Sequence, residues 1–543
     1  MYGRSRVPAP TNEPIRPYAP GDPERDALKA RLAELAADQI EIPLIIGGEE
    51  VRTGDLGEEI VPHRHSHVLA RWHRAGPAEV QRAIEAAREA HHTWSRMRWE
   101  DRAAIFLKAA DLITHTGWRD TLNASTMLGQ SKTAFQAEID AACELADFFR
   151  FNVHFAERIY EDQPLSAPGV WNRMEYRPLE GFVYAISPFN FTSIGGNLAG
   201  APALMGTTVV WKPSDHAVFS NYFVYKLLEE AGLPPGVVNF VPGDPVQVTD
   251  AVLSSPDFGG LHFTGSTAVF KRLWGMVGER METFRSYPRL VGETGGKDFI
   301  FAHPSAGVDA LRTAIVRGAF EYQGQKCSAA SRAYIPESVW ARLEQPLVDE
   351  TAAIAMGDPA DFRNFMSAVI HRGAFDKIKG YIERARADAD AEILVGGECD
   401  DSEGFFVRPT IIRTTRPDYV TMCEEIFGPV ITVYVYPDAD WEAMLDVLDG
   451  TSPYGLTGAV FSQDRAAARV VTERLRYAAG NFYVNDKPTG AVVGQQPFGG
   501  SRASGTNDKA GSALNLLRWV SPRTIKETFV PPTDYRYPFM GAE

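Results

Sequence analysis

Short apolar runs alternate with helical stretches along most of the chain from about residue 181 onward. Between the runs, apolar residues recur every three or four positions, which is the helical period. Strand-like runs separated by helices of this length are typical of βαβ units, whose strands lie parallel in one sheet. The runs are 182–187, 207–211, 237–241 and 260–265, followed by 298–303, 430–436 and 458–462. The pattern predicts an α/β protein with a second α/β segment that begins near residue 293.

The first 160 residues follow a different pattern. Residues 28–38 are predicted to form a short helix, and 43–53 a pair of strands that turns at Gly47 and Gly48. A layer of helices is predicted to follow. Its members are 77–96, 99–116 and 133–160. The first 23 residues contain six prolines, which block both helix and sheet, so we expect an extended arm over the surface.

Small, polar and cationic residues follow the first four strands predicted after residue 181. The carboxyl ends of parallel strands meet at one edge of a sheet, where ligands bind in open α/β folds. These ends are 187–190 (SPFN), 212–215 (KPSD), 242–244 (PGD) and 264–266 (TGS). Such an edge suits a nucleotide. The G-x-G-x-x-G fingerprint of the ordinary dinucleotide turn is absent, because Phe270 stands where a later glycine would follow Gly265.

Composition narrows the class of protein without identifying it. The 543 residues are 44% hydrophobic and 23% charged, as in ordinary globular proteins. The net charge of −15 leaves no electrostatic footprint for nucleic acid or an anionic membrane surface. No apolar stretch approaches the roughly 20 residues that span a bilayer. Four cysteines without a CxxC pair exclude a disulfide framework, so we expect a reducing, cytoplasmic location.

Cys327 is the strongest candidate nucleophile on local grounds. It follows the cationic Lys326 among small residues, and a thiolate forms at neutral pH beside positive charge or at a helix N-terminus, both of which this segment could supply. A buried structural cysteine is the alternative. Of the other cysteines, Cys143 falls on the apolar stripe of a helix and is assigned to the core, Cys399 is incidental, and Cys423 is ambiguous.

Glu293 is a candidate general base. It ends an apolar run and precedes two glycines, and a carboxylate against apolar walls can activate water. A capping role is equally compatible with the local sequence.

Three histidines alternate in the segment PHRHSH and would share one face of a strand. They are His63, His65 and His67. Since no carboxylate or cysteine stands at a matching spacing, we interpret them as a solvated surface patch and expect no metal site. Neither a G-x-S-x-G elbow nor a P-loop is present, which disfavours the α/β-hydrolase and P-loop NTPase classes.

Seven segments in order resemble the aldehyde dehydrogenase superfamily, from about residue 40 to 530. They are SPFNF (187–191), WKPSD (211–215), FTGS (263–266), ETGGK (293–297), QGQKCSA (323–329), EEIFGPV (424–430) and PFGGSRASG (497–505). Several details resemble one branch, the L-glutamate γ-semialdehyde (Δ1-pyrroline-5-carboxylate) dehydrogenases of proline catabolism. These details are SPFNFTSIGGNL, GQQPFGGSRASGTNDKAG, the tail SPRTIKET and Phe270 itself.

The resemblance implies an α/β aldehyde dehydrogenase fold with a doubly wound NAD-binding domain, an α/β catalytic domain and a small β oligomerisation flap. The expected NAD-binding domain comprises 31–163 and 181–292, after an extended arm over 1–30. The catalytic domain is expected over 293–513. The flap would combine 164–180 with 514–543, both rich in aromatic residues and proline, and would join at least two subunits.

The resemblance also implies the chemistry. Cys327 would attack the aldehyde, and the oxyanion would be held by the Asn190 side-chain amide and the Cys327 backbone N–H. NAD would accept hydride, and Glu293 would activate the water that hydrolyses the thioester. The acidic Asp215 would favour NAD over NADP, because a carboxylate repels a 2′-phosphate.

Further roles follow from the resemblance for residues around both ligands. For NAD, Lys212 would reach the adenosine ribose, Ser266 the pyrophosphate and Glu425 the nicotinamide ribose, while Phe427 would wall the nicotinamide. The remaining cofactor positions are Ser187, Pro188, Phe189, Ser214, Gly243 and Gly265. For the substrate, Ser328 and the backbone N–H groups of Gly490 and Ala491 would hold the α-carboxylate. Phe191, Phe498, Glu144 and Lys326 would complete that site.

Three other functions are compatible with part of this residue pattern. A succinate or aminoadipate semialdehyde dehydrogenase would share Cys327 and Glu293 but would anchor its carboxylate differently. A thiol esterase would not need WKPSD and EEIFGPV, and a structural protein of this fold would be expected to lose Cys327 or Asn190. The arm leaves room for a proline dehydrogenase partner.

Overall fold

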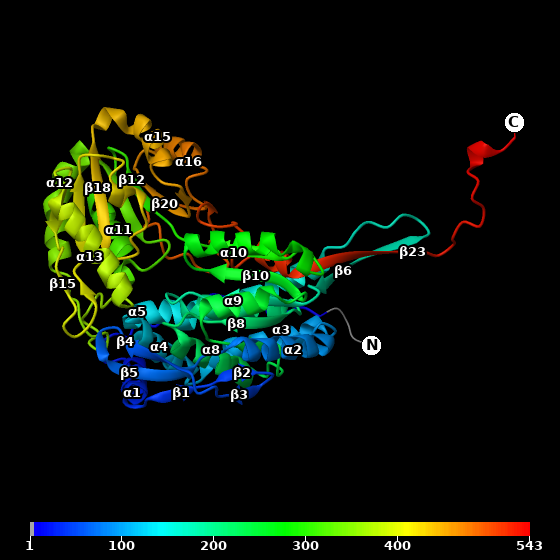
Figure 1. The fold of residues 1–543 in the computed structure, drawn as a ribbon. Helices are drawn as coiled ribbons and strands as arrows, with labels where there is room; N and C mark the ends of the chain where they lie inside the picture. Colours follow the sequence, from blue (N-terminus) through cyan, green and yellow to red (C-terminus); the bar gives the residue numbers. More distant parts are fainter. Residues whose placement is uncertain (1–4, 543) are drawn as a thin grey trace.

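Two seven-stranded sheets form the body of the protein in the computed structural model, which describes residues 5–542 (Figure 1). The first sheet has the order β11-β10-β7-β8-β9-β2-β3. Its five parallel strands are β7 (Phe182–Ile186), β8 (Thr208–Lys212), β9 (Val238–Phe240), β10 (Phe258–Thr264) and β11 (Arg289–Glu293). The four apolar runs predicted for this region are thus confirmed as parallel strands. β11 is an additional strand.

Helices cover both faces of this sheet because its strands are apolar on both sides. Val183, Ala185 and Val209 pack into a core with α3 (Trp99–His115), α4 (Trp118–Gln130), α6 (Leu145–Glu161), α7 (Thr192–Leu204) and α8 (Val218–Ala231). Phe182 and Tyr184 point the other way, into a core with α2 (Pro77–Trp94), α9 (Pro245–Leu253) and α10 (Thr267–Glu279). Alternating side chains of a strand therefore pack into two separate cores, because successive side chains point to opposite faces of a sheet.

The second sheet has the order β14-β17-β18-β13-β12-β20-β21 and lies at the upper left of Figure 1. The three runs predicted here are confirmed as β12 (Asp298–Ala302), β18 (Val430–Tyr436) and β20 (Thr457–Phe461). The pattern missed β13 (Ala330–Pro336), β14 (Ala391–Val395), β17 (Thr410–Thr414) and β21 (Asn481–Val484). Helices α11 (Val308–Phe320) and α12 (Glu337–Ala352) cover one face, and α15 (Trp441–Thr451) and α16 (Arg465–Arg474) the other.

Three helix predictions need correction. The helices predicted at 77–96, 99–116 and 133–160 do not form one layer, because α2 packs on the opposite face of the sheet from α3 and α6; we define α3, α4 and α6 as the helical layer. The first helix, α1, spans Pro23–Ala37 rather than beginning at residue 28, because Pro23 occupies the first helical turn, where its missing N–H is tolerated. The expected arm is accordingly shorter than 1–30. The helix predicted over 133–160 is instead α5 (Ala134–Ala137), a π-helix (Glu138–Glu144) and α6.

The strand pair predicted at 43–53 is confirmed as β2 (Leu44–Ile46) and β3 (Glu49–Val51), which are antiparallel. Both turn glycines adopt positive φ, +62° at Gly47 and +81° at Gly48. A three-stranded sheet of β1 (Ile40–Ile42), β4 (Leu56–Val61) and β5 (Arg64–His73) was not predicted.

Two segments far apart in the sequence form a two-stranded ribbon. Strand β6 (Val170–Pro178) pairs antiparallel with β23 (Val520–Thr528) over nine residues. Figure 1 shows the ribbon projecting away from both sheets. Its surroundings are apolar and exposed, with Leu165, Phe529 and Val530 at 93%, 61% and 82% exposure.

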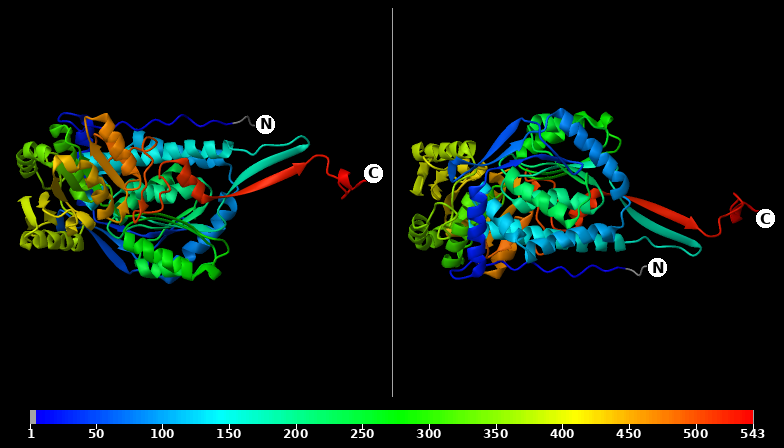
Figure 2. Two further views of the ribbon diagram at one scale, coloured as in Figure 1. Left: turned by 90° about the horizontal axis from the view of Figure 1, so that it is seen from above. Right: turned by 90° about the horizontal axis from the view of Figure 1, so that it is seen from below.

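The N-terminal arm is extended and runs beside the helical layer (Figure 2). It is held at a buried ion cluster. Arg119 on α4 pairs with Glu138 of the π-helix, and both side chains are at most 2% exposed. Arg119 also pairs with Glu13 of the arm at 2.6 Å, and the Tyr18 hydroxyl donates to Glu138 at 2.8 Å. Burial alone would raise the pKa of the Glu138 carboxyl, but its bonds to Arg119 hold it below the ordinary value.

Removing one member of this cluster should leave a buried charge without a partner. We expect Arg119→Ala to lower the free energy of unfolding by about 3–5 kcal/mol. The control is Arg31→Ala, which removes a surface pair with Glu34 and should change it by no more than about 1 kcal/mol. Denaturant unfolding at one protein concentration compares them. Equal, small effects would show that the cluster does not anchor the arm.

Candidate active site

A cavity of about 560 Å³ lies where the two α/β halves and the helical layer meet. The nucleophile and base candidates, Cys327 and Glu293, both line it. So do all seven residues expected at the substrate, which are Glu144, Phe191, Lys326, Ser328, Gly490, Ala491 and Phe498. Residues that lie far apart in the sequence therefore share one enclosed space.

A strained loop carries Cys327 to the amino end of β13. Tyr322, Gln323 and Gly324 have consecutive φ values of 50°, 56° and 65°, a left-handed conformation that non-glycine residues rarely adopt. The buried Gln323 side chain fixes the loop by donating to Ser131 O and Ala368 O and accepting from Ser367 N. Sequence patterns gave no sign of this role.

The expectation that Cys327 stands in positive surroundings is wrong. The neighbouring Lys326 pairs with Glu321 at 3.1 Å, and Cys327 lies in a turn rather than at a helix N-terminus. Burial raises the pKa of the thiol well above its ordinary value, and the carboxyls of Asp298 and Glu293 add to the shift. The resting protein therefore favours the thiol.

Glu293 ends β11 and lies against Gly505. Both carboxyl oxygens are buried, and neither has a hydrogen-bond partner among the described residues. Burial raises its pKa well above the ordinary value, and Asp508 adds to the rise while Lys509 opposes it. An acid with such a pKa holds a proton at neutral pH and can exchange it with a group in the cavity.

Asn190 is buried and is not among the residues that line the cavity. Its side-chain amide donates to Gln325 O at 3.0 Å, two residues before Cys327. One amide hydrogen remains, so the side chain can donate to a second oxygen near the nucleophile.

The anchor loop, which we define as residues 489–498, forms one wall. The Ser328 hydroxyl is 2.8 Å from that of Thr489, and Gly490 has a φ of +95°. Lys487 Nζ lies over this turn, 3.2 Å from Thr489 O, and a side chain at Gly490 would meet it at 2.9 Å. This ammonium has no carboxylate partner among the described residues, and sequence analysis overlooked it.

Glu144 adds a carboxyl group to the wall of the cavity. Ser193 Oγ donates to Glu144 at 2.7 Å, and burial raises the pKa of Glu144 to about 8. Phe191 and Phe498 add apolar surface. The cavity is thus lined by donors and a cation at the anchor loop and by carboxyl groups from other elements.

The cofactor candidates lie along the carboxyl edge of the first sheet. Ser187, Pro188 and Phe189 follow β7, Lys212, Ser214 and Asp215 end or follow β8, and Gly243 follows β9. Lys212 pairs with Asp215 at 2.9 Å. Ser266 caps the 13-residue helix α10 after Gly265, which leaves a helix N-terminus for an anion.

The second half contributes Glu425 and Phe427. Glu425 accepts from Gly296 N at 2.9 Å, and the ring of Phe427 lies 5.8 Å from that of Phe189. A side chain at Gly295 would strike the Glu425 carboxylate at 2.4 Å, so the chain approaches this carboxylate closely. Hydroxyl-binding carboxylates, a helix N-terminus and aromatic walls together fit a dinucleotide.

Phe270 explains the missing glycine pattern. Its ring stacks on Phe263 at 5.5 Å and fills the space above Gly292, where any side chain would clash at 2.2 Å. The close packing comes from Gly292 on the strand instead of from a glycine on the helix.

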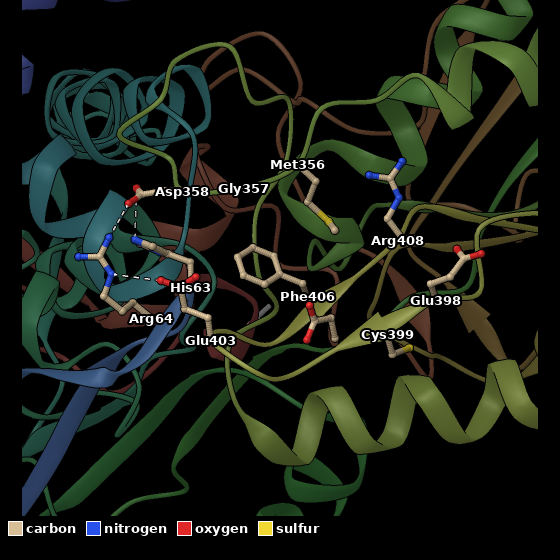
Figure 3. Close-up of a pocket in the computed structure, with 11 residues that line it drawn as sticks. His63, Arg64, Met356, Gly357, Asp358, Glu398, Cys399, Glu403, Phe406 and Arg408 are labelled. Carbon is tan, nitrogen blue, oxygen red and sulfur yellow. Dashed lines mark hydrogen bonds and ion pairs between the residues drawn. The ribbon is translucent and has the colours of Figure 1, made fainter.

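A second cavity, of about 440 Å³, shares no lining residue with the cavity that contains Cys327. Figure 3 shows this second cavity. The prediction of a solvated patch is wrong for His63, which is 6% exposed and lies 2.9 Å from the Ser131 hydroxyl. Figure 3 shows His63 and Arg64 directed at Asp358, at 3.5 and 3.2 Å. The turn between β4 and β5 is buried there against the second α/β half. Half-buried Cys399 also lines this cavity.

Within the described part of the chain, no group of three or more His, Cys, Asp or Glu residues could hold a metal ion. None of the helices between residues 5 and 542 is both long and apolar enough to cross a membrane.

Comparison with known proteins places these features in a family. The aldehyde dehydrogenase family profile matches residues 52–525. The mitochondrial Δ1-pyrroline-5-carboxylate dehydrogenase of Dictyostelium discoideum is 53% identical over 99% of this chain and 97% of its own. The mouse mitochondrial enzyme of that name is 52% identical over 98% and 94%. The crystal structure of the Mycobacterium tuberculosis enzyme bound with NAD is 55% identical, covers both chains completely and has a TM-score of 0.97. The chain belongs to the aldehyde dehydrogenase family.

Proposed function

We propose that this enzyme oxidises L-glutamate γ-semialdehyde, the open form of Δ1-pyrroline-5-carboxylate, to L-glutamate with NAD, the second step of proline catabolism. The observation that carries the proposal is the division of charge in the cavity that contains Cys327. Donors and an ammonium lie at the anchor loop, and the Glu144 carboxyl lines the same cavity. An aldehyde that carries a carboxylate and an ammonium at its far end matches both kinds of group. Relatives with over 50% identity carry the corresponding name.

Cys327 is the proposed nucleophile. The thiol first releases its proton to the solvent, and the sulfur then forms a bond to the aldehyde carbon while the carbonyl oxygen gains the electron pair. The Asn190 amide and the Cys327 backbone N–H donate to that oxygen. Bound NAD supplies the hydride acceptor. The thioester left on Cys327 is then hydrolysed by a water whose proton passes to Glu293 after that carboxyl has released its own proton to the solvent.

At the other end of the substrate, Ser328 and the backbone N–H groups of Gly490 and Ala491 hold the carboxylate. Lys487 balances its charge. Phe191 and Phe498 enclose the aliphatic chain. Glu144 and the Glu321–Lys326 pair face the ammonium, whose positive charge would draw Glu144 into its ionised form.

The dinucleotide lies along the edge already described. Lys212 and Asp215 bind the adenosine ribose, Ser266 the pyrophosphate and Glu425 the second ribose. The proposed contacts are completed by Ser187, Pro188, Phe189, Ser214, Gly243, Gly265 and Phe427.

The domain division is likewise proposed, with 31–163 and 181–292 binding NAD and 293–513 carrying Cys327. A cytoplasmic location and a proline dehydrogenase partner remain predictions, and several relatives are named as mitochondrial.

The ribbon of 164–180 and 514–543 is proposed to join subunits. Both strands have unpaired edges, and a two-stranded ribbon is barely stable alone. Exposed apolar residues beside it supply the surface that a second copy of the chain would cover.

Turnover should depend on Cys327 and on the amino acid end of the substrate. Wild-type protein should form NADH from pyrroline-5-carboxylate much faster than from succinate semialdehyde. Cys327→Ala should lower this rate at least 10⁴-fold and keep NAD binding, while Cys423→Ala should change neither. Preference for succinate semialdehyde would disprove the substrate assignment, and activity in Cys327→Ala would disprove the mechanism.

Alkylation should reveal the electrostatics of the thiol. Because burial and nearby carboxyls raise the pKa of Cys327, inactivation of the free enzyme by iodoacetamide should be slow at pH 7 and should rise steadily beyond pH 9. Glu293→Gln removes one of these carboxyls and should move the profile to lower pH. A plateau reached below pH 8 in wild-type protein would contradict this environment.

Assembly should respond to a charge placed beside the ribbon. We expect a mass of at least twice 59.9 kDa by light scattering. Phe529→Asp should lower that mass, because it buries a carboxylate at the interface, whereas Lys526→Gln should not. A wild-type monomer would refute the proposed role of the ribbon.

A further inference from the structure

The N-terminal arm forms part of the wall of the substrate cavity. Asn12, Glu13, Pro14 and Ile15 line the same 560 Å³ space as Cys327. The sequence led us to expect an arm that merely crosses the surface. Its residues instead lie between the helical layer and the anchor loop.

The Asn12 side chain bridges these two parts of the wall. Its Nδ2 donates to Asp147 Oδ2 on α6 at 2.8 Å and to Val493 O at 2.8 Å. Its Oδ1 accepts from Gln495 Nε2 at 2.9 Å. Both amide hydrogens are thus used, one toward α6 and one toward the anchor loop, and the carbonyl oxygen makes a second bond to that loop.

The next residue fixes the arm in place. Glu13 pairs with Arg119 at 2.6 Å and with Arg150 at 2.8 Å, and its backbone N–H donates to Asp147 Oδ1 at 2.8 Å. Since the Arg119 side chain is 2% exposed, the arm is attached to a buried group and not to a mobile surface. Asn12 therefore reaches the anchor loop from a rigid base.

The anchor loop needs such support because it has little of its own. It lies in the 16 residues between β21 and β22 (Ser501–Arg502), which contain neither helix nor strand. Gly490 and Gly494 both have positive φ, at +95° and +81°, and glycine gives a loop wide conformational freedom. Within the loop, Val492 N donates to the Gln496 side chain, and Phe498 pairs with Ala510. From outside, Ser328 and Lys487 contact the start of the loop at Thr489, and Asn481 donates to Pro497 O near its end. Asn12 adds the contacts to its middle, at Val493 and Gln495.

We propose that Asn12 is a positioning residue, which holds the anchor loop so that the Gly490 and Ala491 N–H groups point at the substrate carboxylate. This inference rests on the proposed function. Val493, which accepts a hydrogen bond from Asn12, is three residues after Gly490, where the proposed carboxylate contacts begin. It acts through the loop and takes no part in the bond changes at Cys327.

The test compares two aldehydes. Asn12→Ala should raise KM for glutamate γ-semialdehyde about tenfold, because a misplaced loop would weaken substrate binding by about the contribution of one hydrogen bond. Its kcat/KM for propanal, which lacks the carboxylate, should stay within about twofold of wild type. The matched control is Ser5→Ala, in the same arm but outside the cavity, where the hydroxyl donates to Glu100 at 3.2 Å. It should change neither value.

A double-mutant cycle tests the route through the loop. If Asn12 acts through Gln495 and Val493, then Asn12→Ala combined with Gln495→Ala should raise KM no further than Asn12→Ala alone. Additive effects would mean that the two residues act separately, and they would overturn the proposal.

The outcomes separate this inference from the proposed function. Wild-type protein that fails to oxidise glutamate γ-semialdehyde disproves the function. Wild-type activity with an unchanged KM in Asn12→Ala disproves the positioning role alone. An equal loss on both aldehydes, with a lowered melting temperature, would show that Asn12 serves general stability and would also overturn it.

Discussion

Exclusion of water governs the cavity that contains Cys327, because most of its ionisable groups lose their hydration and few gain a full complement of partners. The Glu293 carboxyl has no hydrogen bond among the described residues, and Glu144 has one, from Ser193. Burial raises the pKa of both, and that of Cys327 as well. In such a place the protonated, neutral form is favoured until a ligand brings a compensating charge. These three groups are therefore held neutral in the resting site, and ligands decide which of them ionise.

Much of the fold could be predicted because buried parallel strands are continuous apolar runs. Several of the strands that escaped prediction break this rule. Strand β13 carries the buried Arg332, which donates to Lys297 O and so looks polar in sequence while lying in the core. Strands β14 and β21 are edges, where one side of the pairing is absent. The π-helix interrupts an otherwise regular helical period, which a periodic pattern cannot reveal.

Which residues form the candidate site could be predicted from the sequence, but how their charges pair could not. Motif residues such as Cys327 and Phe498 do meet in one cavity. Lys326 adjoins Cys327 in sequence, yet its side chain pairs with Glu321, since the left-handed turn before it sets neighbouring side chains in different directions. The role of Asn12 could not be predicted from the sequence for a different reason. Its contacts with Val493 and Gln495 join residues more than 480 positions apart, and only the folded chain brings them together.

The π-helix from Glu138 to Glu144 connects the contacts of the N-terminal arm with the substrate cavity. At its start Glu138 accepts bonds from the arm, and at its end Glu144 faces the substrate cavity. A π-helical hydrogen bond spans one more residue than an α-helical one, and each π-helical residue turns the chain through a smaller angle than an α-helical residue does. One extra residue can therefore be held inside this segment while the helices on its two sides keep nearly the same relative direction. In evolutionary terms, such a turn is a place where a chain can gain or lose one residue while the cores on either side of it keep their packing.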